Sequence, residues 1–191
     1  IQYIEQQVNK YMNDILQTKD KVDYIVASDT DSIYLCLDKL VEKVCKDKTK
    51  EQKINFINKV VENKLEPFID KCFNQLAKYT NAFQQKMVMK RECIADKGIW
   101  TAKKRYMLNV LDEEGFRFEE PKLKIMGIEA VKSSTPEVCR VAIKEAIKIV
   151  MNKEETDLHN YIAKFREEYK QYEPEQIAFP RSCNNLRKYF S

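Results

Sequence analysis

The sequence predicts an α+β fold, in which an antiparallel sheet with packed helices precedes a purely helical segment. Short β-prone runs lie within residues 24–37 and 84–126, between stretches of helical periodicity. Beyond about residue 133 only the helical period continues. The 191 residues are 43% hydrophobic, which is enough to bury a core. We therefore expect an α+β unit over residues 1–130 and a helical unit over residues 131–191.

The first half of the chain combines helices with a hairpin. Apolar residues at helical spacing predict an amphipathic helix over residues 2–17. In residues 24–37, two β-prone runs flank Asp29 and Asp31 with room only for a tight turn, which predicts a β-hairpin with both carboxylates at its tip. Helical spacing returns from about 50 to 80 and predicts a long helix in which Pro67 could introduce a bend.

The second half begins with strands and ends with helices. Residues 84–96 and 99–110 are β-rich and surround Asp96-Lys97-Gly98, which predicts a turn there, and 116–126 predicts a further strand. The string from Ser133 to Glu137 offers a Ser/Thr cap, a proline at the first helical position and an acid in the first turn. Helices are expected over 136–152 and 154–172.

The composition narrows the classes of function. No stretch approaches the roughly 20 apolar residues of a membrane span, and the N-terminus lacks the apolar region of a signal peptide, so we expect a cytoplasmic protein without a membrane partner. Six cysteines lie far apart without a C-x-x-C pair, which predicts free thiols. The single histidine, His159, lies on a helix of mixed polarity, which argues against histidine-based catalysis.

Carboxylates at the edge of a core indicate a metal or a hydrogen-bond network. Asp29 and Asp31 lie one residue apart between two apolar runs, where a hard cation such as Mg²⁺ would compensate their burial. A plain turn is the alternative, because aspartates are common in turns. Glu92, within a strand predicted to be central, is either a third carboxylate near the hairpin or an ion-pair partner for Arg91.

Positive charge concentrates in residues 84–110. This segment contains seven basic and two acidic side chains, so its net charge of 7 − 2 = +5 exceeds the +4 of the whole chain. If 99–110 continues as a strand, Lys103 and Arg105 share one face, and Lys104 and Tyr106 share the other. Such a pattern suits a sugar–phosphate backbone. The alternative is a charged edge strand that discourages aggregation.

Four motifs in chain order carry a resemblance to a known family. Residues 28–32, Ser-Asp-Thr-Asp-Ser, resemble motif C of the family B DNA polymerases, usually written Y-G-D-T-D-S, with Ala27-Ser28 replacing the usual Tyr-Gly or Ala-Gly. Residues 91–95 resemble the family's R-E-A-I-A strand, and residues 103–106 match its K-K-R-Y element. Residues 124–129 with 133–136 resemble the palm-to-thumb connection in polymerases of T-even-type bacteriophages. The likeness covers nearly the whole chain.

The resemblance implies a fragment of a DNA-directed DNA polymerase that transfers nucleotides by a two-metal mechanism. Residues 1–130 would be part of the palm and residues 131–191 the start of the thumb. Asp31 and Asp29 would be catalytic and would bind two Mg²⁺ ions, with Glu92 as a further carboxylate. The DNA-binding residues would be Lys103, Lys104, Arg105, Tyr106, Ser133 and Ser134. Primer–template DNA and dNTPs would be the partners of the full enzyme.

Other family motifs do not occur in these residues. We find no motif A, no fingers helix and no exonuclease motif, so we predict that the chain alone does not polymerise. A sliding clamp would bind through other regions, and the fragment could form a non-native dimer through exposed sheet edges. Two alternatives stay open from the residues alone: a nucleic-acid-binding module without catalysis, and a metal-dependent D-x-D glycosyltransferase.

Overall fold

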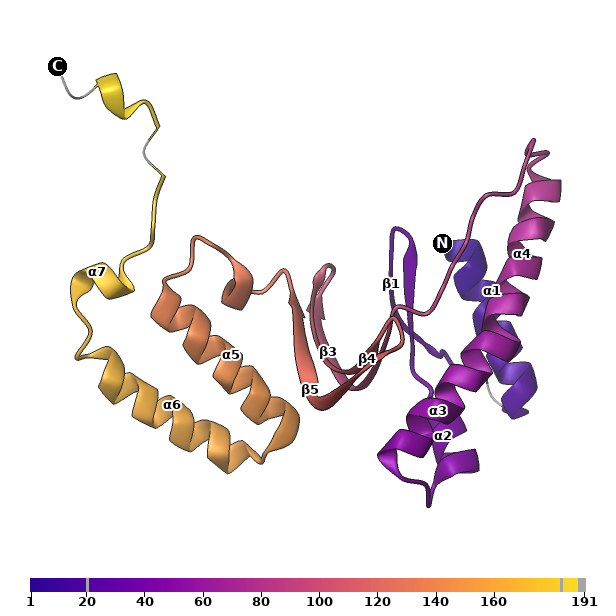
Figure 1. Ribbon diagram of the computed structural model, residues 1–191, viewed down its shortest axis with the longest axis horizontal. Coiled ribbons are helices and arrows are strands. Elements are labelled where there is room, and N and C mark those ends of the chain that lie inside the picture. Colours follow the sequence, from indigo (N-terminus) through magenta and orange to yellow (C-terminus); the bar gives the residue numbers. More distant parts are fainter. Residues whose placement is uncertain (20, 183, 189–191) are drawn as a thin grey trace. The chain divides into compact units, whose positions relative to one another are not determined.

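A computed structural model describes residues 1–19, 21–182 and 184–188, and it has the expected α+β fold (Figure 1). The chain forms two compact units: residues 1–94 with 112–117, and residues 95–111 with 118–191. The expected palm–thumb division at residue 130 is a functional assignment, and it stays a prediction.

The first unit combines helices with the β1–β2 hairpin. Helix α1 (Gln2–Leu16) fulfils the first helical expectation, and α2 (Asp38–Cys45) follows the hairpin without having been predicted. The long helix is divided into α3 (Lys50–Val60), a π-helical segment (Val61–Leu65) and α4 (Glu66–Tyr79). The π segment ends two residues before Pro67, whose nitrogen has no hydrogen to donate to the preceding turn. The perturbation expected near Pro67 is therefore a change of helical hydrogen bonding.

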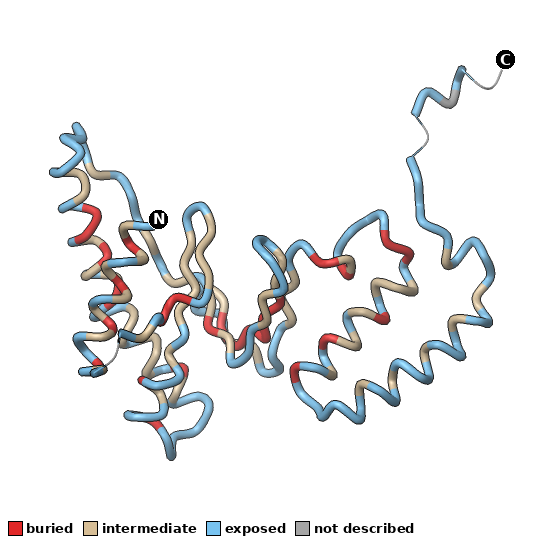
Figure 2. Tube along the Cα trace, turned by 180° about the vertical axis from the view of Figure 1, so that it is seen from behind, coloured by how far each residue is buried: buried red, intermediate tan, exposed pale blue. Residues whose placement is uncertain are grey.

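The core of the first unit lies between α1 and α4, which run side by side in Figure 1. Residues one or two turns apart on α1 face residues of α4 and the first hairpin strand, and Tyr11 stacks on Phe68 with ring centroids 4.0 Å apart. The buried set from α1 is Ile4, Val8, Met12 and Leu16, and that from α4 is Ile69, Cys72 and Phe73. Figure 2 shows these buried positions along both helices.

Two strands form the hairpin of the first unit. β1 (Ile25–Asp29) pairs antiparallel with β2 (Ser32–Leu35), and the register places Asp29 opposite Ser32. Only Thr30 and Asp31 connect these partners, and Thr30 has a positive φ of 22°. The prediction of a tight hairpin is confirmed.

A three-stranded sheet follows, in the order β3 (Cys93–Ala102), β4 (Arg105–Glu113), β5 (Phe116–Met126). The central strand, β4, is buried from Met107 to Asp112. Pro121 lies in the edge strand β5, and edge strands are where proline is tolerated in a sheet.

The turn expected at Asp96-Lys97-Gly98 is wrong, because β3 runs straight through these residues. Asp96 accepts a hydrogen bond from Asn109 of β4 at 2.7 Å, so it takes part in a cross-strand contact. Gly98 lies where neighbouring side chains leave no room for a larger residue: a Cβ there would lie 2.7 Å from the Trp100 ring and 2.8 Å from Leu108. The chain turns instead at Lys103 and Lys104, with Lys104 in the left-handed region at φ 61°.

The strand expected over residues 84–92 is also wrong. These residues form no regular element, and Met87 and Val88 are exposed. The side chain of Gln85 accepts from the Met87 N–H and donates to the Met87 carbonyl, which satisfies the backbone groups a sheet would need. Glu92 therefore precedes an edge strand and does not lie on a central one.

The second unit ends in helices, as expected. A short 3₁₀ helix (Glu129–Val131) precedes α5 (Glu137–Asn152) and α6 (Glu155–Tyr169), which lie side by side, and α7 (Pro174–Ile177) and a 3₁₀ turn (Leu186–Lys188) follow. The expected serine or threonine cap of α5 is wrong: Pro136 is the N-cap residue, and no side chain caps the helix. The core joins β4 and the 3₁₀ helix to α5 through Met107, Ile128, Ala130, Ile147 and Met151.

The described cysteines are free thiols, as their spacing in the sequence predicts. Cys36, Cys45, Cys72, Cys93 and Cys139 are free thiols, and Cys183 lies outside the described residues. Burial raises the pKa of the Cys72 thiol. Among the helices that the described residues form, none is long and apolar enough to cross a membrane.

Candidate metal-binding hairpin and DNA-binding turn

The β1–β2 hairpin presents its carboxylates at the tip. Asp29 is partly buried at the end of β1 and accepts a hydrogen bond from the Thr30 hydroxyl at 3.1 Å. Asp31 is exposed in the turn, and the Ser32 hydroxyl donates to the Asp29 carbonyl at 3.4 Å. The two carboxylates thus occupy a tip whose backbone is tied by its own hydroxyl groups.

A row of polar side chains on α1 holds the hairpin. Asn13 accepts from the Val22 N–H at 2.9 Å and donates to the Val22 carbonyl at 2.8 Å. One turn earlier, Asn9 accepts from the Tyr24 N–H at 2.8 Å. A further turn earlier, Glu5 accepts from the hydroxyl of Ser28 at 3.1 Å. Because these helical positions are four residues apart, one face of α1 aligns residues 22–28.

This row was missed at the sequence level, although the spacing of Glu5, Asn9 and Asn13 is visible there. They form a polar row beside the apolar row Ile4, Val8 and Met12, and the equal spacing of the two rows is the feature that could have revealed them. Ser28 is the residue that departs from the usual glycine of motif C. The structure gives its side chain a partner on α1, so the departure adds a contact beside Asp29.

The hairpin carries two of the side chains that a metal site would need. Carboxylate oxygens are the ligands that hard divalent cations prefer; Asp29 ends β1, and Asp31 lies in the two-residue turn that follows. Across the described ranges, no group of three or more His, Cys, Asp or Glu side chains could hold a metal ion. The donor set fits a divalent cation with Asp29 and Asp31 as a partial set of ligands.

Glu92 is exposed in the segment before β3, and its backbone carbonyl accepts from the Glu114 N–H at 2.7 Å. Its neighbour Arg91 pairs with Asp112 at 2.6 Å. Lys90 pairs with Glu66 at 2.5 Å, and this hydrogen bond raises the pKa of Lys90. A role for Glu92 in metal binding stays a prediction.

Asp112 is a buried carboxylate near the end of β4. Its side chain is 1% exposed; one oxygen accepts from Arg91 and also from the Gly115 N–H at 3.1 Å. The other oxygen lies 3.8 Å from an Arg117 nitrogen. Arg117 in turn donates to Asn55 of α3 at 3.0 Å. This network connects the β4–β5 turn to Arg91 and to α3 within the first unit.

The Lys103–Lys104 turn is exposed. Both lysines are exposed, and Thr101 closes the turn by donating to the Arg105 carbonyl at 3.2 Å. Because Lys103 and Lys104 lie in the turn, the expected sharing of strand faces by Lys103 and Arg105 is wrong. The Tyr106 ring stacks on Trp100 with centroids 6.1 Å apart.

Residues 127–132 brace this turn. Arg105 forms an ion pair with Glu129 at 2.6 Å, and Lys132 contacts the same carboxylate at 2.9 Å. The hydrogen bond from Lys132 is the main cause, and the charge of Arg105 a lesser one, that lowers the pKa of Glu129 to about 2. Gly127 has φ 67° and would place a Cβ only 2.2 Å from the Lys104 carbonyl oxygen. Ser133 and Ser134 follow this segment and are exposed.

Comparison with known proteins supplies the assignment. Residues 7–173 match the divergent family B DNA polymerases. The chain belongs to this family. It is 41% identical, over 199 residues, to the DNA-directed DNA polymerase of Enterobacteria phage T4 and, again at 41%, to that of Escherichia phage RB69. Both alignments cover 99% of the chain.

The chain spans 22% of the length of these two polymerases and so corresponds to a fragment of a DNA polymerase. This relationship argues against the glycosyltransferase alternative. It confirms the resemblance drawn from residues 28–32, 91–95, 103–106 and 124–136, but it does not test the role of any single residue.

Proposed function

We propose that this chain supplies the metal-binding hairpin and a DNA-contacting turn of a DNA-directed DNA polymerase. The observation that carries the proposal is the tip of the β1–β2 hairpin. Asp29 ends β1, Asp31 lies in the two-residue turn that follows, and Glu5 of α1 accepts a hydrogen bond from the adjacent Ser28. The two longer phage polymerases, similar over the full chain, support the same reaction class.

Asp31 and Asp29 act as oxygen ligands in this proposal. When bound, two Mg²⁺ ions would activate the primer hydroxyl and stabilise the charge on the triphosphate and the departing pyrophosphate. The protein's part is to hold the carboxylates in place: Glu5 and Asn9 of α1 fix the strand that leads to Asp29. Remaining ligands would come from the parts of a polymerase that this 22% does not include. Glu92 is the candidate further carboxylate within the chain.

The Lys103–Lys104 turn contacts primer–template DNA in this proposal. Its two ammonium groups are exposed and can reach phosphates or the minor groove without reading the sequence. Arg105 is engaged with Glu129, so it supports the turn more than it offers a free cation. Tyr106, Ser133 and Ser134 complete the proposed contact surface. Residues 1–130 would then belong to the palm and 131–191 to the thumb.

A chimeric enzyme tests the catalytic part. The matching segment of the phage T4 polymerase is replaced by this chain, and template-directed primer extension is measured with and without Asp31→Asn. Extension should fall to background in this variant and persist in Asp47→Asn, which changes another exposed aspartate of the same unit. Unchanged extension by the Asp31→Asn chimera contradicts the role of Asp31.

Metal binding is also measured on the 191-residue chain, which we expect not to polymerise. Mn²⁺ should broaden the amide NMR resonances of residues 28–32 first, because its unpaired electrons act at short range. Asp31→Asn should remove this selectivity. Broadening that spreads over all exposed carboxylates, or that is indifferent to Asp31→Asn, would leave the alternative of a DNA-binding module without catalysis.

The proposal also covers the metal, the cellular compartment and a protein partner. The metal would be Mg²⁺, the enzyme would act in the cytoplasm of a host cell, and a sliding clamp would bind through other regions of the polymerase. Dimerisation of the fragment through exposed sheet edges is an expectation that light scattering would check.

A further inference from the structure

Helix α2 and the start of α3 carry a basic surface that the proposed reaction does not use. An open pocket of about 790 Å³ is lined there by Lys39, Val41, Glu42, Lys43, Lys46 and Lys53. We call it the lysine pocket. Four lysines and one glutamate give its lining a net charge of +3.

Glu42 offsets only one of the four lysine charges of the lysine pocket. Whereas Lys90, Lys132 and Lys148 each pair with a carboxylate, none of the four pocket lysines has an ion pair within residues 1–19, 21–182 and 184–188. Lys43 donates to the Leu16 carbonyl at 3.4 Å, a contact that leaves its charge uncompensated. The remaining excess of positive charge raises the local potential and attracts an anion.

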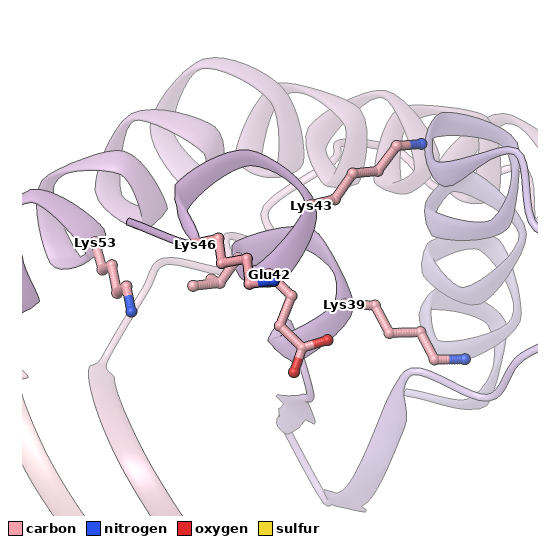
Figure 3. Close-up of a pocket in the computed structure, with 6 residues that line it drawn as sticks. Lys39, Glu42, Lys43, Lys46 and Lys53 are labelled. Atoms are coloured by element: carbon pink, nitrogen blue, oxygen red, sulfur yellow. The ribbon is translucent and has the colours of Figure 1, made fainter. Parts of the chain in front are cut away.

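The spacing of the lysines suits an extended anion. Lys39, Lys43 and Lys46 are separated by four and three residues, so they share one face of α2 and its C-terminal end. Lys39 and Lys46 are about 10 Å apart along the axis, which equals the rise of about three nucleotides on one DNA strand. In Figure 3 the lysine ends point in different directions and do not converge on one point.

The side-chain types suit phosphates and do not suit unpaired bases. Lysine binds phosphates as a compact point charge, and the four cations of the lining are all lysines. It also contains no aromatic ring on which an unpaired base could stack. We propose that the lysine pocket binds the phosphodiester backbone of duplex DNA, independently of base sequence and of the Lys103–Lys104 turn.

The test is DNA binding by the 191-residue chain, followed by fluorescence anisotropy of a labelled duplex between about 50 and 200 mM salt. The pocket variant is Lys39→Gln with Lys46→Gln. The matched control is Lys71→Gln with Lys78→Gln, which changes two lysines of α4 at the same seven-residue separation. Both pairs are also made in a chain that carries Lys103→Gln and Lys104→Gln, so that loss at the proposed turn and loss at the pocket are measured separately.

If both pocket lysines contact phosphates, the slope of log affinity against log salt should become shallower by about 1.8. The loss of affinity should be about 15-fold per lysine at 50 mM salt and about 4-fold at 200 mM. The loss should be the same in the Lys103→Gln, Lys104→Gln background and absent in the control pair.

Each of four outcomes overturns the proposal. The first is a slope of the pocket variant that equals the slope of the unchanged chain, and the second is an equal loss of affinity in the control pair. The third is a single strand that binds more tightly than the duplex and loses the same affinity in the pocket variant, which excludes the duplex as the ligand. Displacement of the duplex by inorganic tripolyphosphate at concentrations too low to act as salt assigns the pocket to a small anion. Far-UV circular dichroism of each variant verifies that the helices are intact.

Discussion

Replacing Gly127 with alanine tests the brace between residues 127–132 and the Lys103–Lys104 turn. A Cβ at this position would lie 2.2 Å from the Lys104 carbonyl oxygen and 3.2 Å from Arg105 Cγ. Because the near neighbour is backbone, relief requires the segment or the turn to move by most of an ångström. The positive φ of 67° adds strain for any residue with a Cβ.

The expected destabilisation follows from these two terms. A left-handed φ costs an alanine about 1–2 kcal/mol, and overpacking against a neighbour that must shift costs about 1–3 kcal/mol. The lower entropy of the unfolded alanine chain offsets about 0.4–1 kcal/mol. The free energy of unfolding should therefore fall by about 2–4 kcal/mol.

Urea denaturation followed by fluorescence of Trp100, the single tryptophan, measures the effect. With an m value of about 2 kcal/mol/M, the midpoint should fall by about 1–2 M. Gly115→Ala is the control, because Gly115 has φ 90° but no atom within 4 Å of the place where an alanine Cβ would lie, so only the conformational strain remains. Equal midpoint shifts in the two variants would refute the steric argument.

Three further predictions concern other contacts of the chain. Asp112→Asn should lower the free energy of unfolding by about 3–5 kcal/mol, because it leaves Arg91 without its buried partner; a change below about 1 kcal/mol in urea denaturation contradicts this. Ser28→Ala should lower the free energy of unfolding by about 1–2 kcal/mol, because the hydrogen bond to the Glu5 carboxylate is lost. In a chain that already carries Glu5→Ala, Ser28→Ala should cause no further decrease in the free energy of unfolding. The lowered pKa of Glu129, about 2 against a usual 4.5, means that its contact is fully present above pH 4.5 and is lost as the pH falls toward 2; an NMR titration midpoint of Glu129 near 4.5 contradicts it.

The local patterns that the sequence reports well are those in which neighbouring residues decide the outcome. Helix α1 and the β1–β2 hairpin appear where the apolar period and the two-residue connection predict them. Helix α2 was not predicted, although Leu37, Leu40 and Val44 have helical spacing, because eight residues give a short pattern.

The misplaced turn shows where sequence patterns fail. The sequence suggested that Gly98 is a turn glycine. The structure shows instead that the position requires a glycine because the side chains of Trp100 and Leu108 pack over it. Lys104 occupies the left-handed region without being glycine or asparagine, so nothing in its residue type indicated the turn. The identity of Asp29 and Asp31 as a tip could be predicted, whereas the support from Glu5 and Asn9 depends on how α1 packs.

The π-helical segment at residues 61–65 has a consequence for changes in chain length. A π turn accommodates a residue more than an α turn, so deleting one residue there could return the helix to a regular α pattern. Ile69 and Phe73 of α4 would then keep their direction toward α1. The same deletion elsewhere in α3 or α4 would rotate everything after it by about 100° and turn these side chains away from the core. Tolerance of deletions is therefore concentrated in a single turn of the long helix.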